Sequence, residues 1–183
     1  MIHRDADGSA ALARARVAGE ALPMLGLLGG DLCTTLGGSG SEANLRSAAA
    51  RRYPVDLGVA IADGVEHVFV AHVIVRRRAW RGRIVAAMNA QWLGSWDLGP
   101  KSHPNDGLLD ISDATLGWSD KLTARKRVAT GTHVPHPGIT VRRTREAVLD
   151  FEPAGTLYVD GVSAGRVRHL ELRVEPDAFS VVI

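Results

Sequence analysis

The segments "YPVDLGVAIADG" at residues 53–64 and "EHVFVAHVIVRR" at residues 66–77 decide how this chain is expected to fold. Both are rich in β-branched and apolar residues, a composition typical of β-strands. The pair Asp63–Gly64 stands between them, and Asp-Gly favours the two-residue type I′ turn of a hairpin. The two segments therefore predict an antiparallel pair of strands.

Strand-like runs continue from this hairpin to the C-terminus and are separated by turn residues. They lie at residues 82–93, 107–116, 139–151, 155–161, 168–176 and 179–183. One helix is expected among them at residues 119–131, with Ser119 as its N-cap and Gly131 as its stop. Many short strands without βαβ alternation favour a mainly β (α+β) fold, with an antiparallel sheet or sandwich from about residue 53 onward.

The residues before the hairpin have a different character. Residues 9–21 are rich in Ala and Arg and predict a helix, and residues 24–32 predict a short buried strand that meets a tight turn. Residues 37–47 are small and polar, as in a linker. We therefore expect two units, a short α/β remnant with a linker at residues 1–52 and a β-sandwich at residues 53–183.

The bulk composition is typical of a globular protein. Of 183 residues, 45% are apolar and 23% are charged, and the formal net charge is only +2. This charge provides no global field to attract nucleic acid, so no nucleic-acid partner is expected. The single Cys33 excludes an internal disulfide and suits a reducing compartment. Asp5 and Asp7 are unlike a secretory signal, so a cytoplasmic location is expected.

Four motifs in the C-terminal part occur in a familiar order and spacing. They are "MNAQWLGSWDLGPKSHPNDGLLDI" (88–111), "GTHVPHPGITVRR" (131–143), "TLYVDG" (156–161) and "HLELRVEPDAFSVVI" (169–183). In these motifs the chain resembles the C-terminal β-rich domain of diacylglycerol kinases and related bacterial lipid kinases, of the NAD kinase-like superfamily. In that family an N-terminal α/β domain carries the nucleotide and the β-rich domain closes the cleft. The resemblance therefore implies a β-sandwich of the lipid-kinase C-terminal type.

Two motifs near the N-terminus, "DADGS" (5–9) and "GGDLCTTLGG" (29–38), resemble the nucleotide loops of the family. Asp5 and Ala6 replace two glycines of the first loop, and a carboxylate there should repel phosphate groups. The strands that would precede this loop are missing, so we expect ATP binding by this chain alone to be impaired. The positions that the resemblance implies for ATP are Asp7, Gly8, Ser9, Gly29, Gly30 and Asp31.

The loop "SHPNDGLLD" (102–110) corresponds to one that holds a structural Mg²⁺ in the family. The resemblance therefore implies Asp106 as a magnesium ligand, together with carbonyl groups near His103 and Leu108. The alternative is a plain turn between two strands at Asn105–Asp106–Gly107, stabilised by its own side chains.

Asp160, in "YVDGV" (158–162), matches the family's candidate general base, which takes the proton from the lipid hydroxyl. Val162 replaces a glutamate of the family motif and removes one acceptor from that acidic network. The alternative for Asp160–Gly161 is a hairpin turn, because Asp-Gly is a favoured type I′ pair.

Two further groups of residues could bind ligands. "RRRAWRGR" (76–83) places five arginines around Trp80, and Arg76, Arg77, Arg78 and Trp80 could contact anionic lipid at the inner membrane face. The alternative is a solvated hairpin tip whose charges keep an edge strand soluble. The spacing of His133 and His136 could suit a metal ion, but no Cys or carboxylate cluster adjoins them, so an ordinary loop is expected.

Three functions are compatible with these expectations. The first is a lipid-kinase-like protein, catalytically impaired alone, that keeps a cleft for a lipid or small anionic ligand. The second is an active ATP-dependent lipid kinase, completed by a separate nucleotide-domain chain or by homo-oligomerisation. The third is a structural or interaction module. The first and third rank above the second because most of a nucleotide-binding domain is missing.

Overall fold

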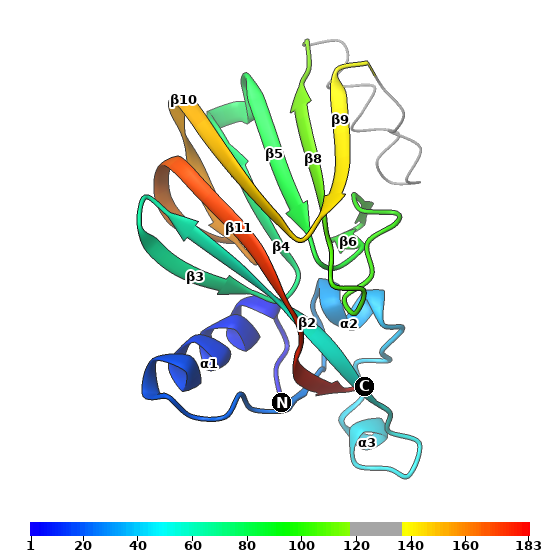
Figure 1. Cartoon of the computed structure of the whole chain (residues 1–183). Helices are drawn as coiled ribbons and strands as arrows, with labels where there is room; N and C mark the ends of the chain where they lie inside the picture. The colour runs from blue at the N-terminus through cyan, green and yellow to red at the C-terminus, as the bar shows by residue number, and fades with distance from the viewer. Residues whose placement is uncertain (118–136) are drawn as a thin grey trace.

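The computed structural model describes residues 1–117 and 137–183 (Figure 1). The helix expected at residues 119–131 and the pair His133 and His136 lie outside the described residues.

An antiparallel sheet forms most of the described part of the chain. Its strands run in the order β3-β2-β11-β10-β4-β5-β8-β9, and β1 pairs in parallel with β11. Two short strands, β6 and β7, form a separate hairpin. The mainly β, antiparallel fold is therefore confirmed. The strands are β1 (Leu25–Gly26), β2 (Arg52–Ala62), β3 (Val65–Phe69), β4 (His72–Arg76), β5 (Arg83–Met88), β6 (Trp92–Leu93), β7 (Trp96–Asp97), β8 (Leu109–Thr115), β9 (Ile139–Thr144), β10 (Glu146–Val159) and β11 (Val162–Val182).

The predicted hairpin is present as β2 and β3, but the second predicted strand, at residues 66–77, divides into β3 and β4, and β4 pairs with β10 and β5 instead of β2. Asp63 and Gly64 have φ angles of 47° and 85°, and a type I′ turn requires positive φ at both central positions. Gly58 pairs with Phe69 across the two strands. A Cβ at Gly58 would lie 2.2 Å from the Phe69 ring, so glycine at this position lets the aromatic ring lie across β2.

Among the described residues, three α-helices lie near the N-terminus, and a short 3₁₀ helix lies between β4 and β5. They are α1 (Asp5–Ala18), α2 (Asp31–Thr35), α3 (Glu42–Leu45) and η1 (Arg78–Trp80). The first helix begins four residues before the expected Ser9, because Asp5 and Asp7 favour a helix N-terminus. It ends at Gly19, whose φ of 69° terminates the helix in the left-handed conformation. The expected linker at residues 37–47 contains α3.

Strand β2 separates two hydrophobic cores because its side chains alternate between the two faces of the sheet. Ala60 and Ala62 face a core that contains Phe69, Leu157 and residues of β5, β8, β10 and β11. On the opposite face, the side chains of Val55, Leu57 and Val59 contribute to a second core.

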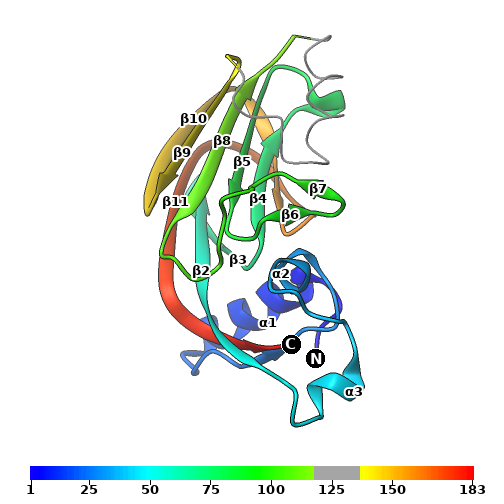
Figure 2. The same cartoon turned by 90° about the vertical axis from the view of Figure 1, so that its right-hand side faces the viewer.

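The N-terminal residues complete this second core. Leu12 of α1, Leu27 after β1 and Leu32 of α2 are at most 1% exposed and pack there with β2 and the end of β11. Figure 2 shows β2 and β11 curving down to α1 and α2. Arg16 links α1 to the sheet through ion pairs with Glu66 at 2.9 Å and Glu175 at 2.7 Å. The N-terminal segment and the sheet thus share a core, while the unit boundary at residue 52 stays a prediction.

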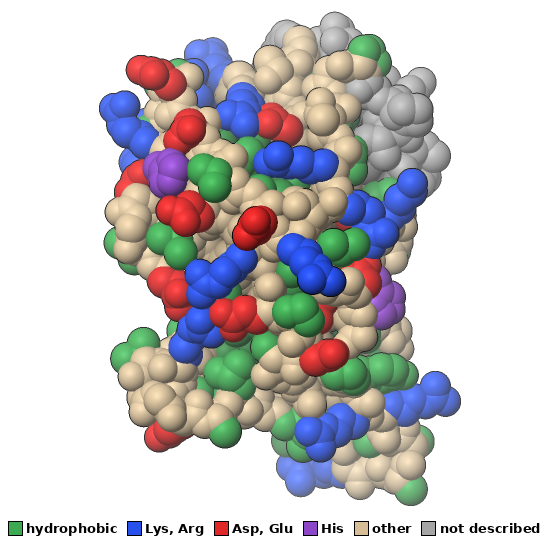
Figure 3. Space-filling model, in the orientation of Figure 1, with side chains coloured by type: hydrophobic (Ala, Val, Ile, Leu, Met, Phe, Trp, Pro, Cys, Tyr) green, Lys and Arg blue, Asp and Glu red, His purple; other side chains and the backbone are tan. Residues whose placement is uncertain are grey.

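Basic and acidic side chains are intermixed on the face shown in Figure 3, in keeping with the small net charge. Within residues 1–117 and 137–183, none of the helices is long and apolar enough to span a bilayer.

Candidate functional site

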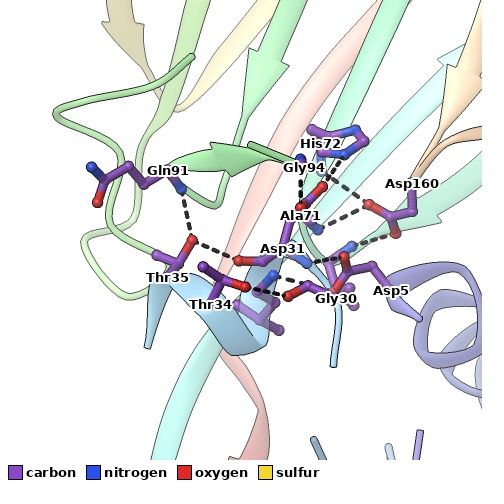
Figure 4. Close-up of polar contacts among 12 residues, drawn as sticks. Asp5, Gly30, Asp31, Thr34, Thr35, Ala71, His72, Gln91, Gly94 and Asp160 are labelled. Carbon is purple, nitrogen blue, oxygen red and sulfur yellow. Dashed lines mark hydrogen bonds and ion pairs between the residues drawn. The ribbon is translucent and has the colours of Figure 1, made fainter. Parts of the chain in front are cut away.

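Four ionisable side chains meet where α1 and α2 pack against the sheet (Figure 4). Asp5 begins α1, Asp31 begins α2, His72 begins β4, and Asp160 lies in the turn between β10 and β11. We call these four residues the junction cluster. The predictions from sequence included Asp31 and Asp160, and the structure brings these two to the same place.

Asp5 binds the first backbone amides of α2. Its carboxylate accepts hydrogen bonds from the Asp31 amide at 2.5 Å and the Leu32 amide at 3.2 Å. Gly30 permits this approach, because a Cβ there would lie 2.5 Å from an Asp5 carboxylate oxygen. Burial raises the pKa of the Asp5 carboxyl to about 6, and the nearby charges of Asp160 and Asp31 act in the same direction.

Asp160 joins its turn to the segment that connects β3 and β4. Its φ of 45° and the φ of 81° at Gly161 confirm the hairpin turn. The carboxylate accepts hydrogen bonds from the backbone amides of Val70 at 3.0 Å, Ala71 at 3.0 Å and His72 at 2.9 Å. Both carboxylate oxygens are therefore already engaged, and the role of Asp160 as a general base stays a prediction.

His72 is a member of the cluster that the sequence analysis missed. The residue is 2% exposed, and its Nε2 lies 3.0 Å from an Asp31 carboxylate oxygen. Burial lowers the pKa of the imidazole, but the Asp31 hydrogen bond and the charges of Asp160, Asp31 and Asp5 outweigh it, so that the pKa is raised. The signal in the sequence was a histidine within the apolar run "VFVAHVIV" (68–75).

The junction also holds α2 to the hairpin of β6 and β7. The second carboxylate oxygen of Asp31 accepts a hydrogen bond from the Gly94 amide at 2.7 Å. The Thr35 hydroxyl accepts one from the Gln91 amide at 3.0 Å. Asp31 thus bridges α2, β4 and the β6–β7 turn, which fixes the position of its carboxylate.

The other residues predicted for ATP lie outside the cluster. Asp7, Gly8 and Ser9 belong to the first two turns of α1 rather than to an open loop. Asp7 is paired with Arg4 at 2.7 Å, Gly8 packs against apolar side chains, and the Ser9 hydroxyl donates to the Asp5 carbonyl at 3.3 Å. Because the helix starts at Asp5, these residues support α1 and its packing; their ATP role stays a prediction.

Gly29 and Gly30 shape the turn that leads into α2. A Cβ at Gly29 would lie 2.7 Å from the His3 carbonyl oxygen. Gly30 has a φ of 95°, which side chains rarely permit. Both glycines thus allow the turn to pack closely against the residues before α1.

Asp106 lies in the expected turn, with Gly107 at a φ of 68°. One of its carboxylate oxygens accepts a hydrogen bond from the Leu108 amide at 3.0 Å, and the other is paired with the guanidinium of Arg143. Arg143 also pairs with Asp110 at 3.0 Å. Among the residues that the structure describes, no group of three or more His, Cys, Asp or Glu side chains could hold a metal ion. A metal role for Asp106 stays a prediction.

A separate pocket of about 350 Å³ lies between the loop at residues 98–101 and strands β8 and β9. Much of its lining is apolar, and its polar side chains include Lys101, Asp110 and Ser112. The lining residues are Leu98, Gly99, Pro100, Lys101, Asp110, Ser112, Ile139 and Val141.

The arginines at the connection between β4 and β5 differ in their surroundings. The Arg76 guanidinium lies over two rings, 4.7 Å from the centre of Trp80 and 4.4 Å from that of Tyr158. Arg77 and Arg78 are exposed at the tip of the connection. Arg76 therefore contributes to packing, and the exposed charge comes from its neighbours.

Comparison with protein families gives a match over residues 41–183, to the YegS C-terminal NAD kinase beta sandwich-like domain. A comparison with curated proteins found no match.

Solved structures with a similar fold include a candidate diacylglycerol kinase from Bacillus anthracis str. Sterne. It is 16% identical, with a TM-score of 0.65, and the alignment covers 87% of this chain and 69% of the other. A second structure with that description is 15% identical, with a TM-score of 0.66 and the same coverage. A diacylglycerol kinase from the same organism is 16% identical over 87% of this chain and 66% of the other, with a TM-score of 0.56. At these identities the similarity concerns the fold.

Proposed function

The chain belongs to the family of the YegS C-terminal NAD kinase beta sandwich-like domain, and from this membership we propose that it is a lipid-kinase-like protein which binds a lipid and transfers no phosphate by itself. Lipid binding is assigned to the pocket beside β8 and β9. The absence of phosphoryl transfer is assigned to the junction cluster.

The observation that carries this proposal is the Asp5 carboxylate on the first amides of α2. Free backbone amides at such a position are what a phosphate group would need. Here the amides of Asp31 and Leu32 already donate to Asp5, and an ionised Asp5 would repel a nucleotide phosphate. ATP binding at Gly29, Gly30 and Asp31 is therefore opposed by both hydrogen bonding and charge.

The state of Asp160 supports the same conclusion. A general base needs a carboxylate within hydrogen-bonding reach of the hydroxyl that it deprotonates. The Asp160 carboxylate accepts hydrogen bonds from three backbone amides, and the residue is 8% exposed. A lipid hydroxyl would have to compete with these amides, so we expect Asp160 to serve the structure rather than the chemistry.

The pocket supports a lipid as the ligand. Its volume of about 350 Å³ lies within the range of small-molecule sites, which are mostly apolar with a few polar groups. Leu98, Ile139 and Val141 would contact an acyl chain, and Lys101 would attract an anionic or hydroxyl-bearing head group. The relatives described as diacylglycerol kinases make a diacylglycerol, or its phosphate, the first ligand to test.

The binding test uses dioctanoylglycerol and dioctanoyl phosphatidic acid, titrated against the full chain by calorimetry. Val141 is 45% exposed in the ligand-free chain and would be covered by the acyl chain. Val141→Glu should therefore weaken binding at least about tenfold, because the bound lipid would bury the carboxylate. Val148→Glu is the matched control, since Val148 is 60% exposed on β10 and lies outside the pocket lining. Equal affinities for the two variants would refute the pocket assignment.

The activity test uses Mg²⁺ and labelled ATP with the same lipids. The isolated chain should give no labelled lipid and no heat of ATP binding at millimolar nucleotide. Transfer that is present in the wild type and abolished by Asp160→Asn would overturn the proposal.

An active kinase is the second candidate, because Asp31, His72 and Asp160 come together from three distant segments. A second copy or a separate nucleotide-domain chain would have to supply the rest of the ATP site. In that case the specific activity should rise with protein concentration or on adding the partner, whereas the first proposal expects no activity at any concentration.

A peripheral contact with anionic membrane is proposed for the tip of the β4–β5 connection. Arg77 and Arg78 are exposed there, and each basic residue near an anionic surface adds about 1 kcal/mol of attraction. Flotation with vesicles containing phosphatidylserine should weaken in high salt and in the Arg77→Gln/Arg78→Gln variant. Flotation unchanged by both would exclude this contact.

A further inference from the structure

Arg143 forms an ionic bridge between two carboxylates at the start of β8. Asp110 and Arg143 are direct partners in the pairing of β8 with β9. The guanidinium contacts Asp110 through Nε at 3.0 Å and Asp106 through Nη2. One side chain on β9 thus holds both the first residues of β8 and the turn before it.

Three of the four oxygens of these carboxylates accept hydrogen bonds, and the fourth, Asp110 Oδ1, is buried without a hydrogen-bond partner among the described residues and meets Arg143 as an ion pair. The Asp106 oxygens accept from the Leu108 amide and from Arg143, respectively. Asp110 is 7% exposed in its side chain, and its second oxygen accepts from the Ser102 hydroxyl at 2.8 Å. The bridge is partly enclosed, since the Arg143 side chain is 39% exposed and that of Asp106 is 26% exposed.

This arrangement does not suit the magnesium ion that the family resemblance implies at Asp106. Mg²⁺ requires oxygen ligands at about 2.0–2.1 Å in an octahedral array and keeps several waters. A Mg²⁺ ion on the Asp106 carboxylate would share that group with a guanidinium that is already bound. The two cations would then repel each other across a short distance in a partly enclosed site.

We propose that the Arg143 guanidinium takes the place of a divalent cation at this turn, so that the fold holds Asp106 and Asp110 together without metal. A planar guanidinium provides several N–H donors in fixed directions, which lets one side chain bind two carboxylates at once. Its position on β9 is set by strand register. The bridge therefore forms as the sheet forms, and it depends on neither lipid nor nucleotide.

The test is thermal unfolding of the full chain in EDTA and in 10 mM MgCl₂ at matched ionic strength. The wild-type Tm should be the same in both. Arg143→Gln should lower the Tm in EDTA by roughly 3–8 °C, because two neighbouring carboxylates lose their counter-charge, and MgCl₂ should restore part of this loss. Arg142→Gln is the control, since Arg142 is the exposed neighbour on β9, and it should show neither effect.

Two further variants distinguish charge from packing. Asp106→Asn in the Arg143→Gln background should abolish the response to Mg²⁺, because it removes the carboxylate that would bind the ion. Arg143→Lys should keep the wild-type indifference to Mg²⁺, because it retains the charge. A saturable rise of the wild-type Tm with Mg²⁺ would overturn the proposal, as would an Arg143→Gln Tm that equals the wild type and ignores Mg²⁺. If Arg143→Gln fails to fold, the Tm values of Arg143→Lys and the wild type with and without Mg²⁺ still test whether the folded chain is indifferent to the ion.

Discussion

Replacing Asp5 with asparagine should stabilise the folded chain at neutral pH, and most of the gain should disappear in mild acid. In the folded chain, burial and the charges of Asp160 and Asp31 raise the pKa of Asp5 from 3.8 to about 6. A carboxyl whose pKa is raised on folding favours the folded state below its unfolded pKa, and this advantage is lost as the pH rises through the folded pKa.

The expected magnitude can be calculated from this change. A pKa that rises from 3.8 to about 6 on folding lowers the free energy of unfolding at pH 7.5 by about 3 kcal/mol, relative to a group that does not titrate. The conversion is about 1.4 kcal/mol for each pKa unit. At pH 4.5 the free energy of unfolding is lowered by only about 1 kcal/mol. Asparagine offers one acceptor oxygen where Asp5 offers two, so one amide bond worth about 1 kcal/mol is lost. The net gain should be about 2 kcal/mol at pH 7.5 and close to zero at pH 4.5.

The assay is urea unfolding of both proteins, followed by tryptophan fluorescence at several pH values between 4.5 and 7.5. The pKa of His72 is also raised. Its stabilising contribution is complete below the ordinary histidine pKa of about 6.5 and is lost as the pH rises through the higher pKa of the folded chain. The interval from pH 4.5 to 6 therefore reports mainly on Asp5. Asp7→Asn is the control, because Asp7 belongs to the same helix but is exposed and paired with Arg4. A difference between Asp5→Asn and wild type that does not change with pH would refute the reasoning.

Three more predictions concern stability and use the same unfolding assay. Gly58→Ala should cost about 1–3 kcal/mol through overpacking, because its Cβ would lie 2.2 Å from the Phe69 ring; adding Phe69→Leu should cost less than the sum of the single changes. Leu157→Ala should cost about 2–5 kcal/mol, because Leu157 is 0% exposed, whereas Val162→Ala, at 55% exposed, should stay within about 0.5 kcal/mol. Asp160→Asn should cost about 1–3 kcal/mol, because buried amides lose acceptors; unchanged stability would mean that these amides find other partners.

Local chemistry explains which parts of the fold could be predicted. The Asp63–Gly64 and Asp160–Gly161 turns depend on backbone preferences of adjacent residues, and both are present. The β-branched and apolar composition of residues 53–64 likewise predicted a strand, which is present as β2. The N-terminal helix was expected to begin at Ser9 but begins at Asp5, and this shift moved Asp7 out of a loop and onto an exposed helix face.

The candidate site was harder to predict from the sequence, because its members are far apart in the chain. Asp5 was noted as a departure from a glycine and from a secretory signal, and His72 was not singled out. Their meeting with Asp160 depends on how α1 packs on the sheet and on where the β10–β11 turn lies. Neither feature has a local signature.

By itself, the amino-acid sequence determined the β-rich architecture, the two Asp-Gly turns and the resemblance to lipid kinases, because these depend on periodicity, turn preferences and the order of motifs. Only the tertiary structure decided that the Asp5 carboxylate occupies the amides of α2, and that Arg143 bridges Asp106 and Asp110. Those contacts join residues that are far apart in the chain, and their geometry is set by strand register and by the packing of α1 and α2 on the sheet.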